Sequence, residues 1–194
     1  MNNHSKESKP HAVIFPYPLQ GHVIPAVHLA IKLASNGFTI TFVNTQAVHH
    51  QIIKSQNLDT TVEDVNIFHG VCKSSLDIRY VTINDGFPIE FDRSLNHDQF
   101  WEGILQAFPA HVDELVAELV RSDPPVTCLI ADTFFVWPTM IARKYNLVNV
   151  SFWTEPVLVL TLYYHIYLLR ENGHFASHGK FLDQPSLLPA YCFF

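Results

Sequence analysis

The sequence predicts an α/β fold, an open parallel sheet with helices on both faces. Two observations predict it. Continuous apolar runs, typical of strands that are buried on both faces, alternate along the chain with stretches of helical periodicity. The segments between them are short, as in βαβ units, whose strands are parallel. We expect one domain of this kind over residues 11–178.

The first βαβ unit opens that domain. Ala12-Val13-Ile14-Phe15 is a continuous apolar run and is predicted to be a buried strand. After a proline-rich turn, apolar residues recur at helical spacing until Asn36-Gly37, where the glycine suits a left-handed helix cap. A second strand, Phe38 to Val43, follows at once. This arrangement is Rossmann-like.

The same alternation continues to about residue 171. A long helix is expected from Asp98 to Val120, capped by Asn96 and kinked at Pro109. The other expected elements are the strands Val81 to Ile83, Val126 to Ala131 and Asn149 to Trp153, and the helices Gln46 to Ser55, Val136 to Tyr145 and Pro156 to Glu171. Residues 1–10 are polar and are expected to form a disordered tail, and residues 179–194 an atypical tail without clear periodicity.

Composition excludes several classes of protein. Hydrophobic residues make up 48% of the chain and charged residues only 15%, which is typical of a globular protein. The net charge of −6, without a basic stripe, argues against nucleic-acid binding. The longest apolar run, Pro156 to Leu169, is shorter than the span of about 20 residues that a membrane helix needs. The polar N-terminus and three cysteines without metal or redox spacing, of which Cys128 is expected to be buried, indicate a cytosolic protein.

Polar residues follow three of the predicted strands. Gly21 and His22 come after the first strand, Asp132 after the strand ending at Ala131, and Thr154 after Trp153. Ligands of open α/β sheets bind beyond the carboxyl ends of the strands. If these strands are neighbours, a carboxylate of Asp132 can hold one ring nitrogen of His22 while the other acts as a general base.

Simpler interpretations exist for each residue alone. The chain has 12 histidines, Asp132 could be a helix N-cap, and Thr154 a cap or a buried hydroxyl. His49-His50 is interpreted as an exposed helix face, not a metal site. The sequence contains no dinucleotide fingerprint, no P-loop and no acidic pair suited to a metal, so no metal is expected.

Taken together, the motifs resemble those of the plant family 1 UDP-glycosyltransferases. Phe91 to Phe100 also resembles one plant subgroup, and the likeness covers about residues 11 to 178. The motifs that carry it are Phe15-Pro16-Tyr17-Pro18-Leu19-Gln20-Gly21-His22-Val23-Ile24-Pro25-Ala26, Phe42-Val43-Asn44-Thr45, Asp85-Gly86-Phe87-Pro88, Leu129-Ile130-Ala131-Asp132-Thr133-Phe134 and Phe152-Trp153-Thr154-Glu155-Pro156.

The resemblance implies the N-terminal half of a GT-B architecture, in which two Rossmann-like domains face a cleft. It implies that His22 is the catalytic base and Asp132 its charge-relay partner. It places Thr154 against the donor sugar and the backbone of Gly21 near the donor phosphates. Phe134 and Phe91 are implied to lie in the acceptor pocket, together with His22.

The implied reaction is the transfer of a sugar, with glucose expected, from a UDP-sugar to a hydroxyl of a small plant metabolite, with inversion. The acceptor is expected to be a flavonoid, another phenolic or a terpenoid. The UDP-sugar is a co-substrate, and no cofactor or metal is expected.

The chain departs from the family pattern in two ways. The donor-binding signature of the family's second domain does not occur in the 194 residues, and after about His178 the sequence resembles no family segment. We therefore expect a partial chain that transfers no sugar alone. Two alternatives remain: a non-catalytic module that binds the aglycone, and a non-functional truncated product.

Overall fold

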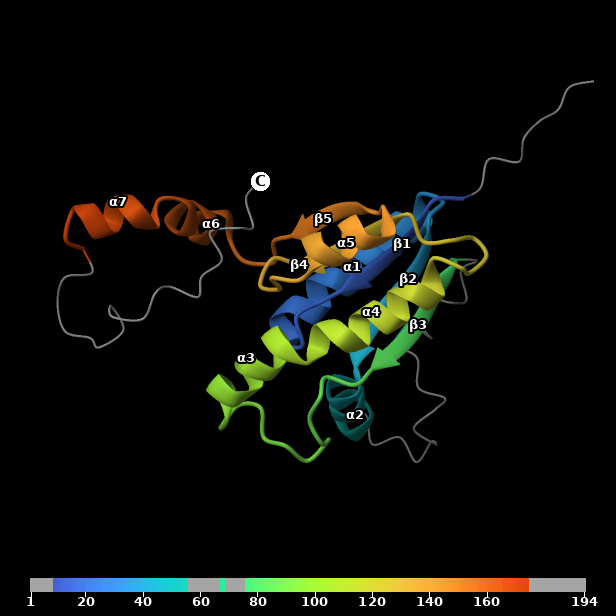
Figure 1. Ribbon diagram of the computed structural model, residues 1–194, viewed down its shortest axis with the longest axis horizontal. Helices are drawn as coiled ribbons and strands as arrows, with labels where there is room; N and C mark the ends of the chain where they lie inside the picture. Colours follow the sequence, from blue (N-terminus) through green and yellow to red (C-terminus); the bar gives the residue numbers. More distant parts are fainter. Residues whose placement is uncertain (1–8, 56–66, 69–75, 175–194) are drawn as a thin grey trace, which may run out of the picture.

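The computed structural model of the chain describes residues 9–55, 67–68 and 76–174 (Figure 1). The two predicted tails therefore lie outside the described residues, apart from Lys9 and Pro10.

The predicted parallel α/β sheet is confirmed. Five strands pair in the order β3-β2-β1-β4-β5, and every pair is parallel. The expected pairing of the first two strands is present, with Ala12 opposite Ile40 and Ile14 opposite Phe42. The strands are β1 (His11–Phe15), β2 (Thr39–Thr45), β3 (Ile78–Ile83), β4 (Cys128–Asp132) and β5 (Val148–Phe152).

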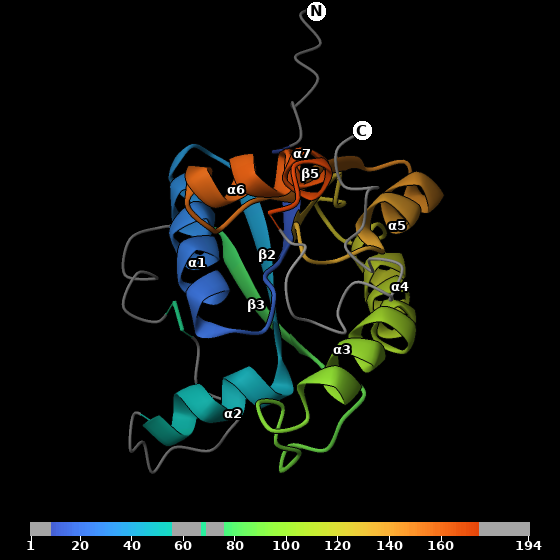
Figure 2. The ribbon, with the colours of Figure 1, turned by 90° about the vertical axis from the view of Figure 1, so that its left-hand side faces the viewer.

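Helices cover both faces of the sheet (Figure 2). Ala12 and Ile14 of β1 pack with α1 in one core, whereas Val13 and Phe15 pack with α3, α4 and α5 in the other. The alternation follows from the strand geometry, because successive side chains point to opposite faces. The helices are α1 (Gln20–Ser35), α2 (Gln46–Ser55), α3 (His97–Gln106), α4 (Phe108–Leu119), α5 (Pro138–Tyr145), α6 (Val157–Tyr164) and α7 (Ile166–Glu171).

The single helix expected from Asp98 to Val120 is in fact two. α3 ends at Gln106 and α4 begins at Phe108, so the predicted kink is a break. Pro109 occupies the first turn of α4, because its ring would clash with the preceding turn of a continuous helix. The predicted cap was also wrong: the Asn96 side chain makes no capping hydrogen bond and donates instead to the carbonyl of Asp92, at 2.9 Å.

The apolar helix expected from Pro156 to Glu171 also divides, at His165, into α6 and α7. Neither helix has a buried residue, and Figure 1 shows both extending away from the sheet. Within the described ranges, no helix is both long enough and apolar enough to cross a bilayer.

Two further expectations were wrong. His49 is buried rather than exposed, because its Nδ1 lies 3.0 Å from the hydroxyl of Tyr80 on β3, while His50 is exposed as expected. Helical periodicity within α2 could not indicate this contact, because Tyr80 lies 31 residues away in the sequence. Cys128 is only partly buried, since it is the first residue of β4; even so, burial raises the pKa of its thiol.

Candidate functional site

The site lies at the carboxyl ends of β1, β4 and β5, which are neighbours in the sheet. Connections leave β1 toward β2 on one side, while β4 lies on the other, so a topological switch point falls between β1 and β4. His22 is in the first turn of α1, Asp132 is the last residue of β4, and Thr154 follows β5 by two residues. The fold therefore brings together the three residues that the sequence placed after separate strands.

His22 and Asp132 form a buried hydrogen-bonded pair. The ring Nδ1 lies 2.7 Å from Oδ2 of the carboxylate, and the two residues are 5% and 3% exposed. An ionised carboxylate only accepts hydrogen bonds, so Nδ1 carries the proton and donates. Nε2 is then left with a lone pair. The predicted contact between these two residues is confirmed by this geometry, whereas their catalytic roles stay predictions.

Asp132 is itself held in place. Its second oxygen, Oδ1, accepts a hydrogen bond of 2.9 Å from the backbone N–H of Phe134. Both carboxylate oxygens thus have donors, and the backbone contact fixes the rotamer that reaches His22. This arrangement orients the imidazole ring and would stabilise it if Nε2 took up a proton.

Thr154 adds a second contact to the same ring nitrogen. Its Oγ1 lies 2.8 Å from Nδ1 of His22, so Nδ1–H is shared between the threonine hydroxyl and the carboxylate. This contact with His22 does not test the predicted contact of Thr154 with a donor sugar, which stays a prediction. In this structure its hydroxyl orients the candidate base.

Glu155 lies on the opposite side of the ring. Its Oε1 is 3.8 Å from Nε2 of His22, and its side chain is 41% exposed. The sequence places Glu155 directly after the predicted Thr154, but it was not among the predicted site residues. Its position in the same strand-end segment was the only signal that could have indicated it.

Aromatic rings surround the imidazole. The ring centroids of Tyr17 and Phe134 are 5.4 and 5.0 Å from that of His22. Trp101 contacts Tyr17 at 5.8 Å, and Trp153 contacts Phe134 at 6.2 Å. Phe134 thus lies beside the candidate base, and its predicted place in an acceptor pocket stays a prediction.

Tyr17 was missed by the sequence analysis as a site residue. Burial, and then the charge of Asp132, raise the pKa of its phenol. Its buried hydroxyl, like the indole N–H of Trp153, has no hydrogen-bond partner within the described part of the chain. Buried polar groups are nearly always paired, so the wall around His22 contains two unused donors.

Phe91 belongs to a separate cluster in the loop after β3. Its ring stacks on Phe87 with centroids 4.5 Å apart, and the guanidinium of Arg93 lies 5.9 Å from its centroid. Arg93 also binds the buried carboxylate of Asp85 through two hydrogen bonds of 2.8 and 2.9 Å. The structure gives no contact between Phe91 and His22, and its predicted role in acceptor binding stays a prediction.

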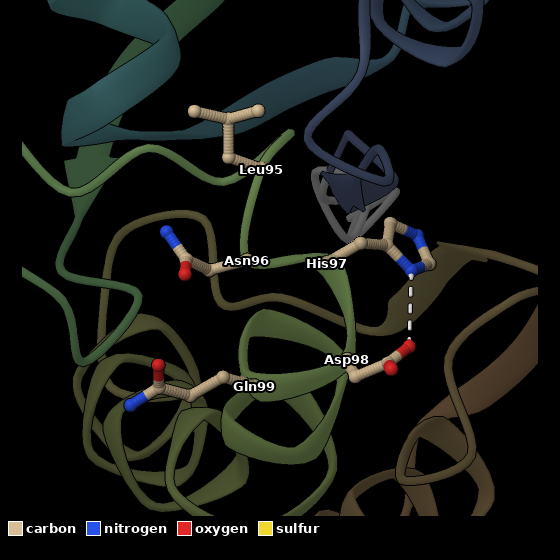
Figure 3. A pocket seen from close by; sticks show the side chains of 5 residues that line it. All are labelled: Leu95, Asn96, His97, Asp98 and Gln99. Carbon is tan, nitrogen blue, oxygen red and sulfur yellow. Dashed lines mark ion pairs between the residues drawn. The ribbon is translucent and has the colours of Figure 1, made fainter.

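Gly21 is exposed, and the space beside its Cα is open, since no atom lies within 4 Å of where a Cβ would be. Its predicted approach to donor phosphates stays a prediction. A depression of about 300 Å³ lies instead at the start of α3, lined by Leu95, Asn96, His97, Asp98 and Gln99 (Figure 3). His97, which lines this depression, stacks on Trp101 with ring centroids 6.4 Å apart, and Trp101 in turn contacts Tyr17.

The described residues contain no group of three or more His, Cys, Asp or Glu side chains that could hold a metal ion. The elements of the site that the structure does show are a histidine held by an aspartate, a flanking glutamate and an aromatic wall.

The fold is that of solved glycosyltransferases. The chain superposes on UDP-glucose: anthocyanidin 3-O-glucosyltransferase in complex with UDP with a TM-score of 0.64 and 24% identity, covering 89% of this chain and 35% of that one. Phytolacca americana UGT2, solved with UDP-2fluoro-glucose and pterostilbene, gives a TM-score of 0.60 at 19% identity, covering 91% and 37%. These likenesses show the fold.

Sequence comparison gives the family. The chain is 65% identical over 187 residues to UDP-glycosyltransferase 86A1 of Arabidopsis thaliana, covering 95% of this chain and 37% of that protein. It is 55% identical to UDP-glycosyltransferase 86A2 of Arabidopsis thaliana, covering 96% and 38%, and 30% identical to Linamarin synthase 1 of Manihot esculenta, covering 95% and 38%. No protein-family model matches the chain. The chain therefore belongs by sequence to the plant UDP-glycosyltransferases, and it spans a little over a third of the length of these relatives.

Proposed function

We propose that this chain is the acceptor-binding and base-carrying part of a UDP-glycosyltransferase. The complete enzyme would transfer a sugar, in our proposal glucose, from a UDP-sugar to a hydroxyl of a small phenolic or terpenoid metabolite, with inversion. The proposal places the protein in the cytosol, where a thiol such as that of Cys128 stays reduced.

One observation carries the proposal: the buried hydrogen bond between His22 Nδ1 and Asp132 Oδ2. It fixes the tautomer in which Nε2 can accept a proton. Its place at the switch point of the sheet is where ligands of open α/β folds bind.

The proposed step is a single displacement. Nε2 of His22 removes the proton from an acceptor hydroxyl while that oxygen attacks the anomeric carbon of the sugar, and UDP leaves from the opposite face. The geometry resembles that of inverting glycosidases, with the acceptor hydroxyl in place of water. Asp132 stabilises the imidazolium that forms. This step uses no metal ion, because the side chain accepts the proton and UDP leaves as a stable anion.

The test joins the chain to those residues of UDP-glycosyltransferase 86A1 that it does not match. We expect this fusion to transfer glucose from UDP-glucose to a flavonol, as measured by product formation. In the fusion, His22→Ala should lower the rate by about 10²–10⁴-fold, the usual contribution of a positioned base. His28→Ala, which removes an exposed histidine of the same helix, is the matched control and should leave the rate unchanged.

An unchanged rate in His22→Ala would rule out His22 as the base. The 194-residue chain alone is expected to show no turnover and no UDP-glucose binding at millimolar concentrations, as measured by calorimetry. Saturable binding of UDP-glucose to the chain alone would show that it also carries the donor site, which the proposal assigns to residues outside it.

A further inference from the structure

Two consecutive residues contact opposite nitrogens of the candidate base. Thr154 Oγ1 lies 2.8 Å from Nδ1 of His22, and Glu155 Oε1 lies 3.8 Å from Nε2. A ligand bound at Nε2 on the side of Glu155 would therefore also lie close to the Glu155 carboxylate. This carboxylate has no part in the proton transfer proposed above.

The separation of 3.8 Å is too long for a direct hydrogen bond between Nε2 and Oε1. It is also the separation of two acceptors, because Nδ1 carries the ring proton and an ionised carboxylate only accepts. Two acceptor atoms side by side are best satisfied by a ligand that presents two donors. A ligand with hydroxyls on neighbouring carbons has that pattern.

The two acceptors, Nε2 of His22 and Oε1 of Glu155, differ in their exposure to solvent. His22 is 5% exposed, whereas the side chain of Glu155 is 41% exposed, so the carboxylate is accessible from solvent. The partly exposed ring of Phe134 lies 5.0 Å from the imidazole ring. Its flat apolar face favours an aromatic ligand next to the two acceptors.

We propose that Glu155 is a specificity-determining residue that selects acceptors with two adjacent hydroxyls on an aromatic ring, the catechol pattern. The inference rests on the proposed function. The hydroxyl that is attacked gives its proton to Nε2 of His22. The neighbouring hydroxyl keeps its proton and donates a hydrogen bond to Oε1 of Glu155.

The experiment measures the binding of two probes, catechol and phenol, to the 194-residue chain by ligand-observed NMR. Catechol should bind about tenfold more tightly than phenol, the effect of one hydrogen bond to a charged group. Glu155→Gln should reduce that ratio to about threefold, because a hydrogen bond to a neutral acceptor is roughly half as strong as one to a charged acceptor. Glu114→Gln, which makes the same change at an exposed position of α4, should leave the ratio at its original value.

The outcomes separate this inference from the proposed function. If His22→Ala weakens both probes but the catechol-to-phenol ratio is the same in the original chain and in Glu155→Gln, the inference is wrong and the acceptor site stands. If Glu155→Gln, made in the fusion with 86A1 residues, changes the KM for UDP-glucose while the catechol-to-phenol ratio of the chain stays the same, the carboxylate faces the donor and the inference is wrong.

If neither probe binds, or if His22→Ala changes neither affinity, the acceptor site itself is wrong and both proposals fail. Far-UV circular dichroism of each variant, compared with the unaltered chain, shows whether its fold is retained. Glu155 is exposed and conservative replacement leaves its size unchanged, so we expect this variant to fold normally.

Discussion

The centre of the sheet and its β5 edge differ sharply in burial. Every residue of β1 and β2 is buried, whereas four of the five residues of β5 are exposed, and the helices that follow β5 have no buried residue. Figure 1 shows the same contrast, with β1 and β2 inside the body of the molecule and α6 and α7 outside it.

The candidate site spans this boundary. His22 lies in the first turn of α1, which follows the buried strand β1, and Asp132 ends the largely buried strand β4. Thr154 and Glu155 instead follow the exposed strand β5. Asp132, which orients the imidazole ring of His22, therefore belongs to the buried core. Thr154 and Glu155, which also contact this ring, lie at the exposed β5 edge of the sheet. Changes on the two sides of His22 should therefore differ in size.

The largest effect should come from the buried side. Asp132→Asn keeps an oxygen for the N–H of Phe134 but can turn a donor toward Nδ1 of His22, which would place the ring proton on Nε2. In the fusion with 86A1 residues we expect about a 10⁴-fold loss in rate, as for the same change in a Ser-His-Asp triad.

Thr154→Val, on the exposed side, should lower the rate only about two- to tenfold, because it removes one neutral hydrogen bond. Steady-state rates measure both, and equal losses would show that burial does not decide the contribution.

A pair of identical substitutions sharpens the comparison for stability. Val13 in β1 is 0% exposed and Val148 in β5 is 63% exposed. We expect Val13→Ala to lower the free energy of unfolding by about 2 kcal/mol, through lost burial and a cavity. Val148→Ala should lower it by less than about 0.5 kcal/mol. Urea unfolding of the 194-residue chain gives both values, and a comparable loss at Val148 would mean that the β5 edge is covered.

The buried centre of the sheet is also where the sequence predicts the structure best. Runs such as Ala12 to Phe15 are apolar throughout because both of their faces pack against helices, so the pattern alone indicates a buried strand. Helix boundaries were less predictable. The kink predicted at Pro109 is a complete break at Ala107, and the apolar spacing gave no signal for the break at His165.

The candidate site shows the same limit. His22, Asp132 and Thr154 could be placed together because the carboxyl ends of neighbouring parallel strands meet at one edge. The approach of Glu155 to Nε2 could not be predicted, because it depends on the side-chain direction after β5. The two hydrogen bonds between Asp85 and Arg93 were missed for a similar reason, since they join residues within an irregular loop.

A pH dependence of stability is expected at the buried end of β1. His11 is 0% exposed; its Nδ1 lies 2.7 Å from the carbonyl of Pro124, and its Nε2 lies 2.8 Å from the hydroxyl of Thr41. A carbonyl only accepts, so Nδ1 donates and Nε2 accepts from the threonine. Burial, helped by the charge of Arg79 and opposed by Pro124 and Asp77, lowers the pKa of this histidine from 6.5.

The lowered pKa fixes the sign of the effect. As the pH falls below about 6.5, the unfolded chain takes up the proton at His11 before the folded chain does, so the folded state loses stability until the pH reaches the lower, folded pKa. The contribution is fully present above pH 6.5 and changes by at most about 1.4 kcal/mol per pH unit below it. His11→Asn keeps a donor for Pro124 but cannot titrate, so the stability difference between the original chain and this variant should shrink from pH 7.5 to pH 5. Urea unfolding at several pH values measures that difference, and exposed His28→Asn is the control, which should show no such trend. If the stability difference between the original chain and His11→Asn stays constant from pH 7.5 to pH 5, His11 takes up a proton as readily in the folded chain as in the unfolded chain. The buried end of β1 would then tolerate a positive charge.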